Sequence, residues 1–362
     1  MTTTETTLPD LYWPWKGKNL TGYLANAVTL KRGHGSLTEA AYVAQLCSLL
    51  PVTCIDEHGN IHIDTRTAPE HRTLLTAHTD TVHRTGGKNA VKVDRESEPG
   101  QEFWRAHGAA LGADDGAGIA LVCHLIDHGF KGYAVLFRGE EVGGIGSKGL
   151  AESQPELLQE FDRAIAFDRA GYYDVITHQS GDRCASDEFA QALADQINLA
   201  GDFMFCPDAG GVYTDTAEFT HLIAECTNLS VGYFRQHGDG EYQNVTFLQK
   251  LAEALLTVNW DSLPVVRKAE LEFDDPWSLY KHDLEADLCE ALEQALAGYY
   301  LGINRMLSQT GAEAYGLTAE EACGFMRFDK LTKVLLSTAL EDLVTGAAAE
   351  DIMLDMYDEI TR

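Results

Sequence analysis

Two kinds of apolar segment alternate along most of the chain. Short runs rich in apolar and β-branched residues have the pattern of strands, and longer segments with apolar positions three or four apart have the pattern of amphipathic helices. Strands separated by helices predict an α/β domain with a mixed, largely parallel central sheet and helices on both faces. The predicted strands lie at 59–65, 71–80, 133–137, 163–167, 202–206 and 228–233, and the predicted helices at 36–50, 116–129, 147–153, 155–161, 186–198 and 245–258.

The first of these helices carries a start signal. Ser36 stands three residues before Glu39, which is the spacing of a capping box. Ser36 should therefore be the N-cap of a helix that runs to about Leu50. Residues 1–35 are rich in aromatic side chains and irregular in pattern, so no regular element is predicted there.

The pattern changes beyond Pro264. Residues 265–362 contain helical periods, for example at 281–300 and 330–344, and no convincing strand. The sequence therefore predicts two parts, an α/β domain at 1–264 and a helical C-terminal extension at 265–362.

The charge balance narrows the classes of partner. The chain has 56 Asp and Glu residues against 27 Lys and Arg, which gives a formal net charge of -29. Such a charge repels nucleic acid phosphates and anionic membrane surfaces, so neither is expected as a partner. Bound divalent cations would offset part of this excess.

The spacing of the cysteines and the length of the apolar runs indicate the cellular compartment in which the protein is expected. The eight cysteines form no C-x-x-C pair and lie in apolar surroundings, as buried free thiols do. No stretch approaches the roughly 20 apolar residues that a membrane span needs, and the N-terminus lacks the pattern of a signal peptide. The sequence predicts a reducing, cytoplasmic location.

Residue types that bind metal ions recur where predicted strands end or helices begin. Loops at the carboxyl ends of the strands of an α/β sheet lie together and collect ligands, so these side chains are expected to converge. A single such residue would mean little, but four segments in succession carry them. They are His78 and Asp80 in TAHTD, Asp114 and Asp115 in LGADDGAG, Glu140 and Glu141 in FRGEEVGGIG, and Asp168 in IAFDRAG.

Several carboxylates gathered in one place need a compensating charge. Like charges repel and each loses hydration on burial, unless cations neutralise them. Mixed imidazole and carboxylate ligands suit zinc, and also manganese or cobalt, better than calcium or magnesium. A zinc-type metal centre is therefore predicted.

The order of these motifs, followed by H-G-D-G-E at 237–241, resembles that of the co-catalytic zinc exopeptidases, the superfamily of peptidase T and the zinc aminopeptidases. The resemblance covers roughly residues 70–260. It implies a hydrolase of peptide or amide bonds that uses two divalent metal ions, Zn²⁺ in the first place.

The resemblance also implies a ligand set. His78 and Asp168 would bind one ion, Glu141 and His237 would bind the other, and Asp114 would bridge both. The motif around His237 is the loosest of the set, and His221 and His178 are alternative ligands.

Three further features follow from the same resemblance. Glu140 would be the general base, which takes a proton from the attacking water and passes it to the leaving nitrogen. Asp80 would accept a hydrogen bond from the free imidazole nitrogen of His78. The peptide bond between Asp114 and Asp115 would be cis.

Motif spacing separates the branches of the superfamily. His78 and Asp114 are 36 positions apart, and Asp168 and His237 are 69 apart. The first interval is too short for an inserted domain and the second reads as continued α/β structure, so the chain is similar to the compact, lid-free aminopeptidase branch.

Three functions remain open on the sequence alone. An aminopeptidase acting on small peptides is favoured. A carboxypeptidase, dipeptidase or N-acyl amino acid deacylase is the alternative, with Arg235 or Arg138 facing the substrate carboxylate. A metal-binding protein without turnover is disfavoured because a structural site has no use for Glu140. A homo-oligomer is left open.

Overall fold

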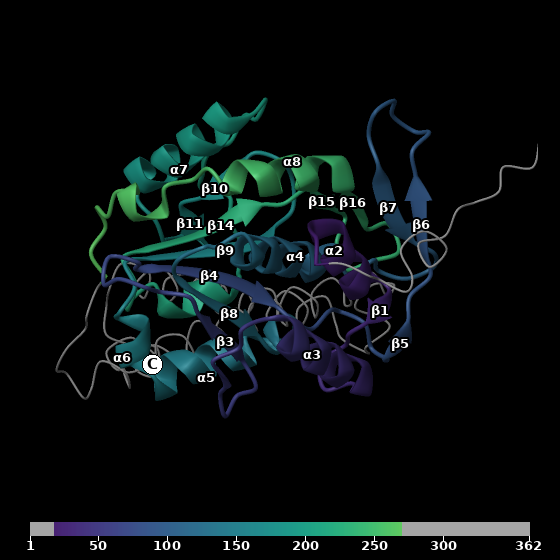
Figure 1. Ribbon diagram of the computed structural model, residues 1–362, viewed down its shortest axis with the longest axis horizontal. Helices are drawn as coiled ribbons and strands as arrows, with labels where there is room; N and C mark the ends of the chain where they lie inside the picture. Colours follow the sequence, from purple (N-terminus) through teal and green to yellow (C-terminus); the bar gives the residue numbers. More distant parts are fainter. Residues whose placement is uncertain (1–17, 270–362) are drawn as a thin grey trace, which may run out of the picture. The chain divides into compact units, whose positions relative to one another are not determined.

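The computed structural model describes residues 18–269, and their central feature is an eight-stranded sheet of order β13-β10-β14-β9-β4-β8-β3-β2 (Figure 1). Strands β14, β9, β4 and β8 run parallel in the middle, while β3 and β2 continue antiparallel at one edge. At the other edge β10 is antiparallel to β14 and β13 is parallel to β10. The strands are β2 (Cys54–Ile55), β3 (Ile61–Asp64), β4 (Thr73–His78), β8 (Tyr133–Phe137), β9 (Arg163–Arg169), β10 (Asp174–Ile176), β13 (Cys206–Asp208) and β14 (Glu225–Ser230).

Both faces of this sheet are buried under an apolar core. Side chains of successive strand residues point to opposite faces, so one strand contributes to both cores. In β8, Tyr133, Val135 and Phe137 belong to one apolar core, while Ala134 and Leu136 belong to the other. The core that contains Ala134 and Leu136 is formed with the helices α2 (Leu20–Val28), α3 (Leu37–Leu49), α4 (Ala113–Asp127), α7 (Asp187–Ala200) and α8 (Val245–Leu255). The core that contains Tyr133 is formed with α5 (Ile145–Ser153), α6 (Pro155–Leu158) and the 3₁₀ helix η2 (Asp215–Phe219).

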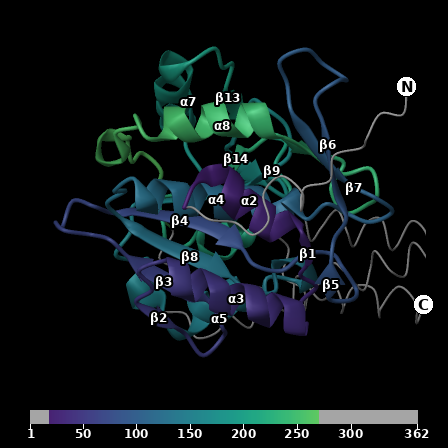
Figure 2. The same ribbon diagram turned by 45° about the vertical axis from the view of Figure 1, so that its right-hand side comes forward.

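Helix α4 lies along β4 and β9, with α2 packed beside it (Figure 2). Its apolar residues, such as Ile119 and Leu121, are completely buried. The helix begins at the edge of the sheet where β4 and β9 end, so its first residues lie among the loops that follow those strands.

A smaller sheet of order β15-β16-β7-β6 lies beside the main one, and its strands come from distant parts of the chain. Strand β7 pairs with β16, so Trp104 lies opposite Gln243. This pairing brings the segment around His237 next to the segment that precedes α4. The strands are β6 (Val91–Asp94), β7 (Phe103–Ala106), β15 (Tyr233–Phe234) and β16 (Tyr242–Asn244), and the remaining short elements are β1 (Leu30–Lys31) with β5 (Gly87–Lys88), β11 (His178–Gln179) with β12 (Asp182–Arg183), and the 3₁₀ helices η1 (Glu140–Val142) and η3 (Trp260–Ser262).

The predicted fold class is confirmed, with differences in detail. The side chain of Ser36 accepts a hydrogen bond from the Glu39 amide and caps α3, as the capping box indicates. The expectation of no regular element in residues 1–35 was wrong for α2, which is short and lies against α4. The strand predicted at 202–206 begins only at Cys206, and the hairpin of β6 and β7 was not predicted.

Two other expectations are only partly met within residues 18–269. Cys123, Cys184 and Cys226 are buried free thiols, whereas Cys54 and Cys206 are exposed, contrary to the sequence interpretation. The proposed helical extension at 265–362 lies almost wholly outside the described residues. None of the helices that the structure describes combines the length and apolar character that crossing a bilayer requires.

Candidate metal centre

Loops at one edge of the sheet carry the predicted site residues. His78 is the last residue of β4, Glu140 and Glu141 follow β8, and Asp168 lies near the end of β9. Parallel strands end at the same edge, which is why three segments of different sequence position meet there. The first turn of α4 and the loop after β15 add Asp114 and His237.

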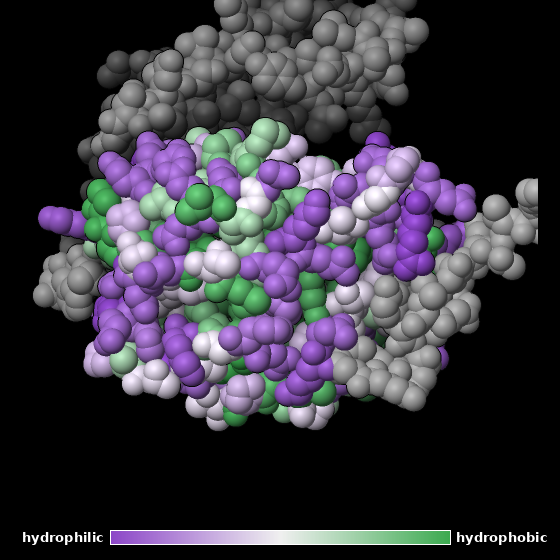
Figure 3. Space-filling model, turned by 45° about the horizontal axis from the view of Figure 1, so that its top comes forward, coloured by the Kyte–Doolittle hydropathy of each residue, from purple (hydrophilic) through white to green (hydrophobic). Residues whose placement is uncertain are grey.

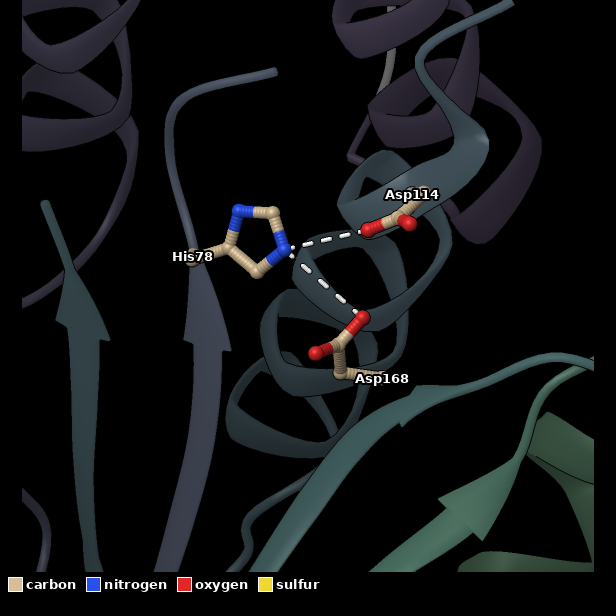
Figure 4. A group of neighbouring side chains, drawn as sticks. All are labelled: His78, Asp114 and Asp168. Atoms are coloured by element: carbon tan, nitrogen blue, oxygen red, sulfur yellow. Dashed lines mark hydrogen bonds and ion pairs between the residues drawn. The ribbon is translucent and has the colours of Figure 1, made fainter. Parts of the chain in front are cut away.

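The first group of side chains is His78, Asp114 and Asp168, which converge as Figure 4 shows. The Nε2 atom of His78 lies 3.1 Å from Oδ1 of Asp114 and 3.6 Å from Oδ1 of Asp168. All three side chains are at least nine-tenths buried. An imidazole and two carboxylates thus point at one small volume.

The second group shares one member with the first and consists of Asp114, Glu141 and His237. Nε2 of His237 lies 3.1 Å from Oδ2 of Asp114 and 3.3 Å from Oε2 of Glu141. Asp114 therefore presents one oxygen to each of two imidazoles. The His237 side chain is 55% exposed, so the site opens to solvent beside this residue.

Glu140 and Asp80 lie next to the two groups without belonging to them. Oε2 of Glu140 is 3.9 Å from Nε2 of His78. Oδ1 of Asp80 lies 3.6 Å from Nδ1 of His78, on the far side of the ring. This separation is longer than a hydrogen bond, and Nδ1 of His78 has no hydrogen-bond partner within residues 18–269, so the expected bond to Asp80 is not formed. The carboxylate of Asp80 accepts hydrogen bonds instead from the amides of Gly139, Glu140 and Glu141. Asp80 thereby ties the loop that carries both glutamates to the end of β4.

Backbone contacts hold the start of α4 in place. The peptide bond between Asp114 and Asp115 is cis, as the resemblance implied. The buried carboxylate of Asp115 accepts hydrogen bonds from the amides of His78 and Gly118. Asp115 thus joins the His78 segment to the first turn of α4, while its neighbour Asp114 faces the two imidazoles.

The charges in this cluster perturb one another strongly when no cation is bound. Burial raises the pKa of Glu140 to about 10 and that of Glu141 to about 7, and Asp168 and Asp114 add to these effects. Burial lowers the pKa of His78, but Asp168 and Asp114 outweigh it and hold the pKa well above its usual value. The Asp114 carboxylate raises the pKa of His237 to about 9. The free cluster therefore holds protons that a cation would displace.

Several contributors to the site were not singled out from the sequence. Thr214 and Tyr233 donate hydrogen bonds to the two oxygens of Asp168, at 2.7 and 3.0 Å. Asp215 is buried, one of its oxygens lacks a hydrogen-bond partner, and burial raises its pKa to about 7. No spacing rule points to these residues, because they reach the site from a loop, from the start of η2 and from the edge strand β15.

Other polar side chains, among them those of the alternatives His178 and Arg138, lie in different settings. The ring of His178 pairs with the hydroxyl of Thr177. Glu225 begins β14, at the sheet edge opposite the site, and accepts hydrogen bonds from Ser186. Arg169 donates to Asp174, and Arg138 lies 3.6 Å from Glu39. Neither His178 nor His221 belongs to the two groups of converging ligand types, which include His237.

The residues present fit a pair of divalent cations. Each group offers one imidazole nitrogen and two carboxylate oxygens, all within 4.8 Å of one another. The Oε1 atom of Glu141 is buried without a hydrogen-bond partner. Closely packed, buried carboxylates of this kind are stabilised when cations lie between them. Imidazole with carboxylate is the donor set of zinc, manganese and cobalt sites.

Comparison with known proteins adds evidence on the fold. No family model matches the chain, and no curated protein sequence matches it. Solved structures match this chain in fold. Aminopeptidase PepT from Bacillus cereus is 14% identical with a TM-score of 0.54, and the match covers 66% of this chain and 96% of that one. A tripeptidase from Staphylococcus aureus is 16% identical with a TM-score of 0.52, with the same shares covered.

This chain therefore shares the α/β fold of these two peptidases. At this level of identity the likeness establishes the fold alone. The segment between Asp168 and His237 contributes β10, β13 and β14 to the central sheet. Within the described residues, no separate lid domain is inserted at that point.

Proposed function

We propose that this chain is a metal-dependent exopeptidase that removes N-terminal residues from small peptides. Two divalent ions, zinc in the first place, would lie side by side. One would be held by His78, Asp168 and Asp114, and the other by Glu141, His237 and Asp114.

One observation carries this proposal, which is the position of Asp114 between two imidazoles. Its Oδ1 faces His78 and its Oδ2 faces His237, each at 3.1 Å. A carboxylate that addresses two separate ligand groups suits a pair of neighbouring ions, because a single ion would use only one of its oxygens. The remaining carboxylates, Glu141 and Asp168, then divide between the two groups.

Glu140 is the residue best placed to move protons. Its side chain lies beside the cluster but is absent from both ligand groups. When bound, the two ions would lower the pKa of water and polarise the scissile carbonyl. Oε2 of Glu140 would accept the proton of the attacking water and then deliver it to the leaving nitrogen, so that the peptide bond breaks without a free amide anion.

Two features favour an aminopeptidase. The solved structures of similar fold are described as an aminopeptidase and a tripeptidase. The site is open beside His237, and the chain inserts no lid between Asp168 and His237 that would supply basic side chains for a substrate carboxylate. A free N-terminal amine, by contrast, suits the acidic surroundings of the cluster.

The test uses the full chain, stripped with a chelator and reloaded with zinc, manganese or cobalt. Trialanine, its N-acetyl form and its C-terminal amide are offered separately. We expect cleavage of trialanine and the amide, but not of the N-acetyl form, and loss of activity on chelation. The exposed Glu152→Gln variant serves as the control for substitution of an acidic side chain.

Other outcomes would redirect or end the proposal. Cleavage of the N-acetyl form with rejection of the C-terminal amide would indicate a carboxypeptidase or deacylase at the same centre. Absence of turnover on all three substrates, with two ions bound, would favour a metal-binding protein without catalysis.

A further inference from the structure

The backbone amides of the loop that carries Asp114 donate hydrogen bonds to a single buried carboxylate. Glu241 is 1% exposed, and its Oε2 accepts hydrogen bonds from the amides of Leu111 and Gly112, at 2.8 and 3.1 Å. Its Oε1 accepts from the amides of Ala113 and Asp114, at 2.7 and 3.1 Å. Four consecutive amides thus point at one side chain.

This arrangement caps α4 from a distant part of the chain. The N-cap position of α4 is Gly112, which has no side chain to accept hydrogen bonds from the first amides. Glu241 fills that role with a negative charge, which the helix N-terminus favours. Glu241 lies four residues after His237, so the cap joins the loop of His237 to the loop of Asp114.

A buried arginine side chain donates a hydrogen bond to a backbone carbonyl of the same loop. Arg32 is completely buried, and its Nη2 donates to the carbonyl of Gly112 at 2.8 Å. Its Nη1 donates to the carbonyl of Thr79 at 3.0 Å, one residue beyond His78. The guanidinium also lies over the ring of Tyr42, 4.9 Å from its centre. Arg32 therefore joins the loop of Asp114 to the loop of His78.

We propose that Arg32 and Glu241 are positioning residues that set the distances from Asp114 to the two imidazoles. Arg32 fixes the distance from Asp114 to His78, and Glu241 fixes the distance from Asp114 to His237. Neither residue touches the ions; each acts on the backbone that carries a ligand. The inference rests on the metal centre proposed above and goes beyond it, because it assigns each ion its own support.

A division of labour follows from the geometry. Loss of Glu241 frees the His237 loop from the Asp114 loop, so the ion held by His237 should be weakened most. Loss of Arg32 frees the His78 loop, so the ion held by His78 should be weakened most. A merely structural role would lower the free energy of unfolding without choosing between the ions.

The chain supplies a matched control at the opposite edge of the sheet. The completely buried Glu225 accepts hydrogen bonds from the amides of Ser186, Val266 and Arg267. Arg267 donates to the carbonyls of Thr220, Ile223 and Ala224. These residues make the same kinds of contact as Glu241 and Arg32. They lie at the amino ends of the parallel strands, whereas the metal ligands lie at the carboxyl ends.

The experiment compares Glu241→Gln with Glu225→Gln, and Arg32→Lys with Arg267→Lys. A glutamine would turn its amide N–H group toward backbone amides that also donate, and a lysine would not span both carbonyls. Zinc affinities of the full-length variants are measured by competition with a chromophoric chelator, and cobalt spectra report each site. Wild-type protein that binds no ion would end the proposed centre before the variants are compared.

We expect Glu241→Gln to weaken the binding of the ion held by His237 about 10- to 100-fold. Arg32→Lys should weaken the binding of the ion held by His78. The two control variants should keep both affinities, whatever their thermal stability. The proposal is overturned if Glu241→Gln or Arg32→Lys binds both ions as tightly as the wild type. It is also overturned if the control variants lose the ions equally. If one of the two test variants does not fold, the other decides the outcome by the same criterion.

Discussion

Glu140 and Glu141 are neighbours in the chain, yet their carboxylates face different groups. Oε2 of Glu140 lies 3.9 Å from the ring of His78, whereas Oε2 of Glu141 lies 3.3 Å from the ring of His237. The short 3₁₀ helix that holds both turns adjacent side chains in different directions. Two acidic residues can therefore serve as base and as ligand without competing.

Glu140→Gln and Glu141→Gln should consequently have different effects. The first removes the proton acceptor, so turnover should fall about 10²- to 10⁴-fold while two ions stay bound. The second removes a ligand of one ion only. Elemental analysis of the dialysed variants, with peptide hydrolysis assayed in parallel, separates the two. Full turnover in Glu140→Gln would show that the base lies elsewhere.

Asp80→Asn should weaken the centre without removing a ligand. The carboxylate of Asp80 faces Nδ1 of His78 and accepts three amides of the Glu140 loop, and an asparagine would place a donor against donors. Metal affinity should fall about 10- to 100-fold, as is typical for residues that orient a ligand. Competition with a chelator measures this, and unchanged affinity would show that Asp80 supports only the fold.

The metal-free protein should lose stability as the pH rises. Burial raises the pKa of Glu141, of Asp215 and of Glu241 to about 7. Between their ordinary values near 4 and about 7, the folded state holds more protons than the unfolded state, so the free energy of unfolding falls with rising pH.

The raised pKa values of His78 and His237 extend the same decline above pH 7, because these rings also hold their protons more tightly when folded. Thermal melts of chelated protein between pH 5 and 9 test this. Added zinc should reverse the trend, since cations compete with protons for the ligands. A metal-free protein that gains stability from pH 5 to pH 7 would contradict the electrostatic picture.

Gly144→Ala should impair turnover through a contact outside the ligand set. Gly144 has a φ of +67°, and a Cβ there would lie 1.8 Å from Oη of Tyr213. Gly143, with a φ of +101°, has open space at the same position and so carries only the backbone strain. Gly144→Ala should therefore reduce kcat more than Gly143→Ala, and adding Tyr213→Phe should recover part of the loss. Equal effects of the two glycine variants would exclude this contact as the cause.

The sequence predicts most of the central sheet because its strands are buried and apolar. His78, Asp114, Glu140 and Asp168 were recognised because each follows such a strand or opens a helix, where local pattern and position in the sheet agree. Their roles at a metal centre remain proposals.

The parts that the sequence did not predict depend on contacts between distant segments. Strand β7 is ordered by pairing with β16, and the short helix α2 is buried against α4. Arg32 and Glu241 act through backbone groups of a remote loop, so no motif spacing reveals them. Hydrophilic residues predominate on the face seen in Figure 3, as the acidic composition indicates.

Zinc titration of the wild type and of Asp114→Ala tests the shared carboxylate most directly. Wild-type protein should bind two ions per chain. Asp114→Ala removes a ligand from both groups at once and leaves Glu141 and Asp168 to repel one another, so both ions should be lost together. Two ions bound with wild-type affinity in Asp114→Ala would contradict the two-ion centre.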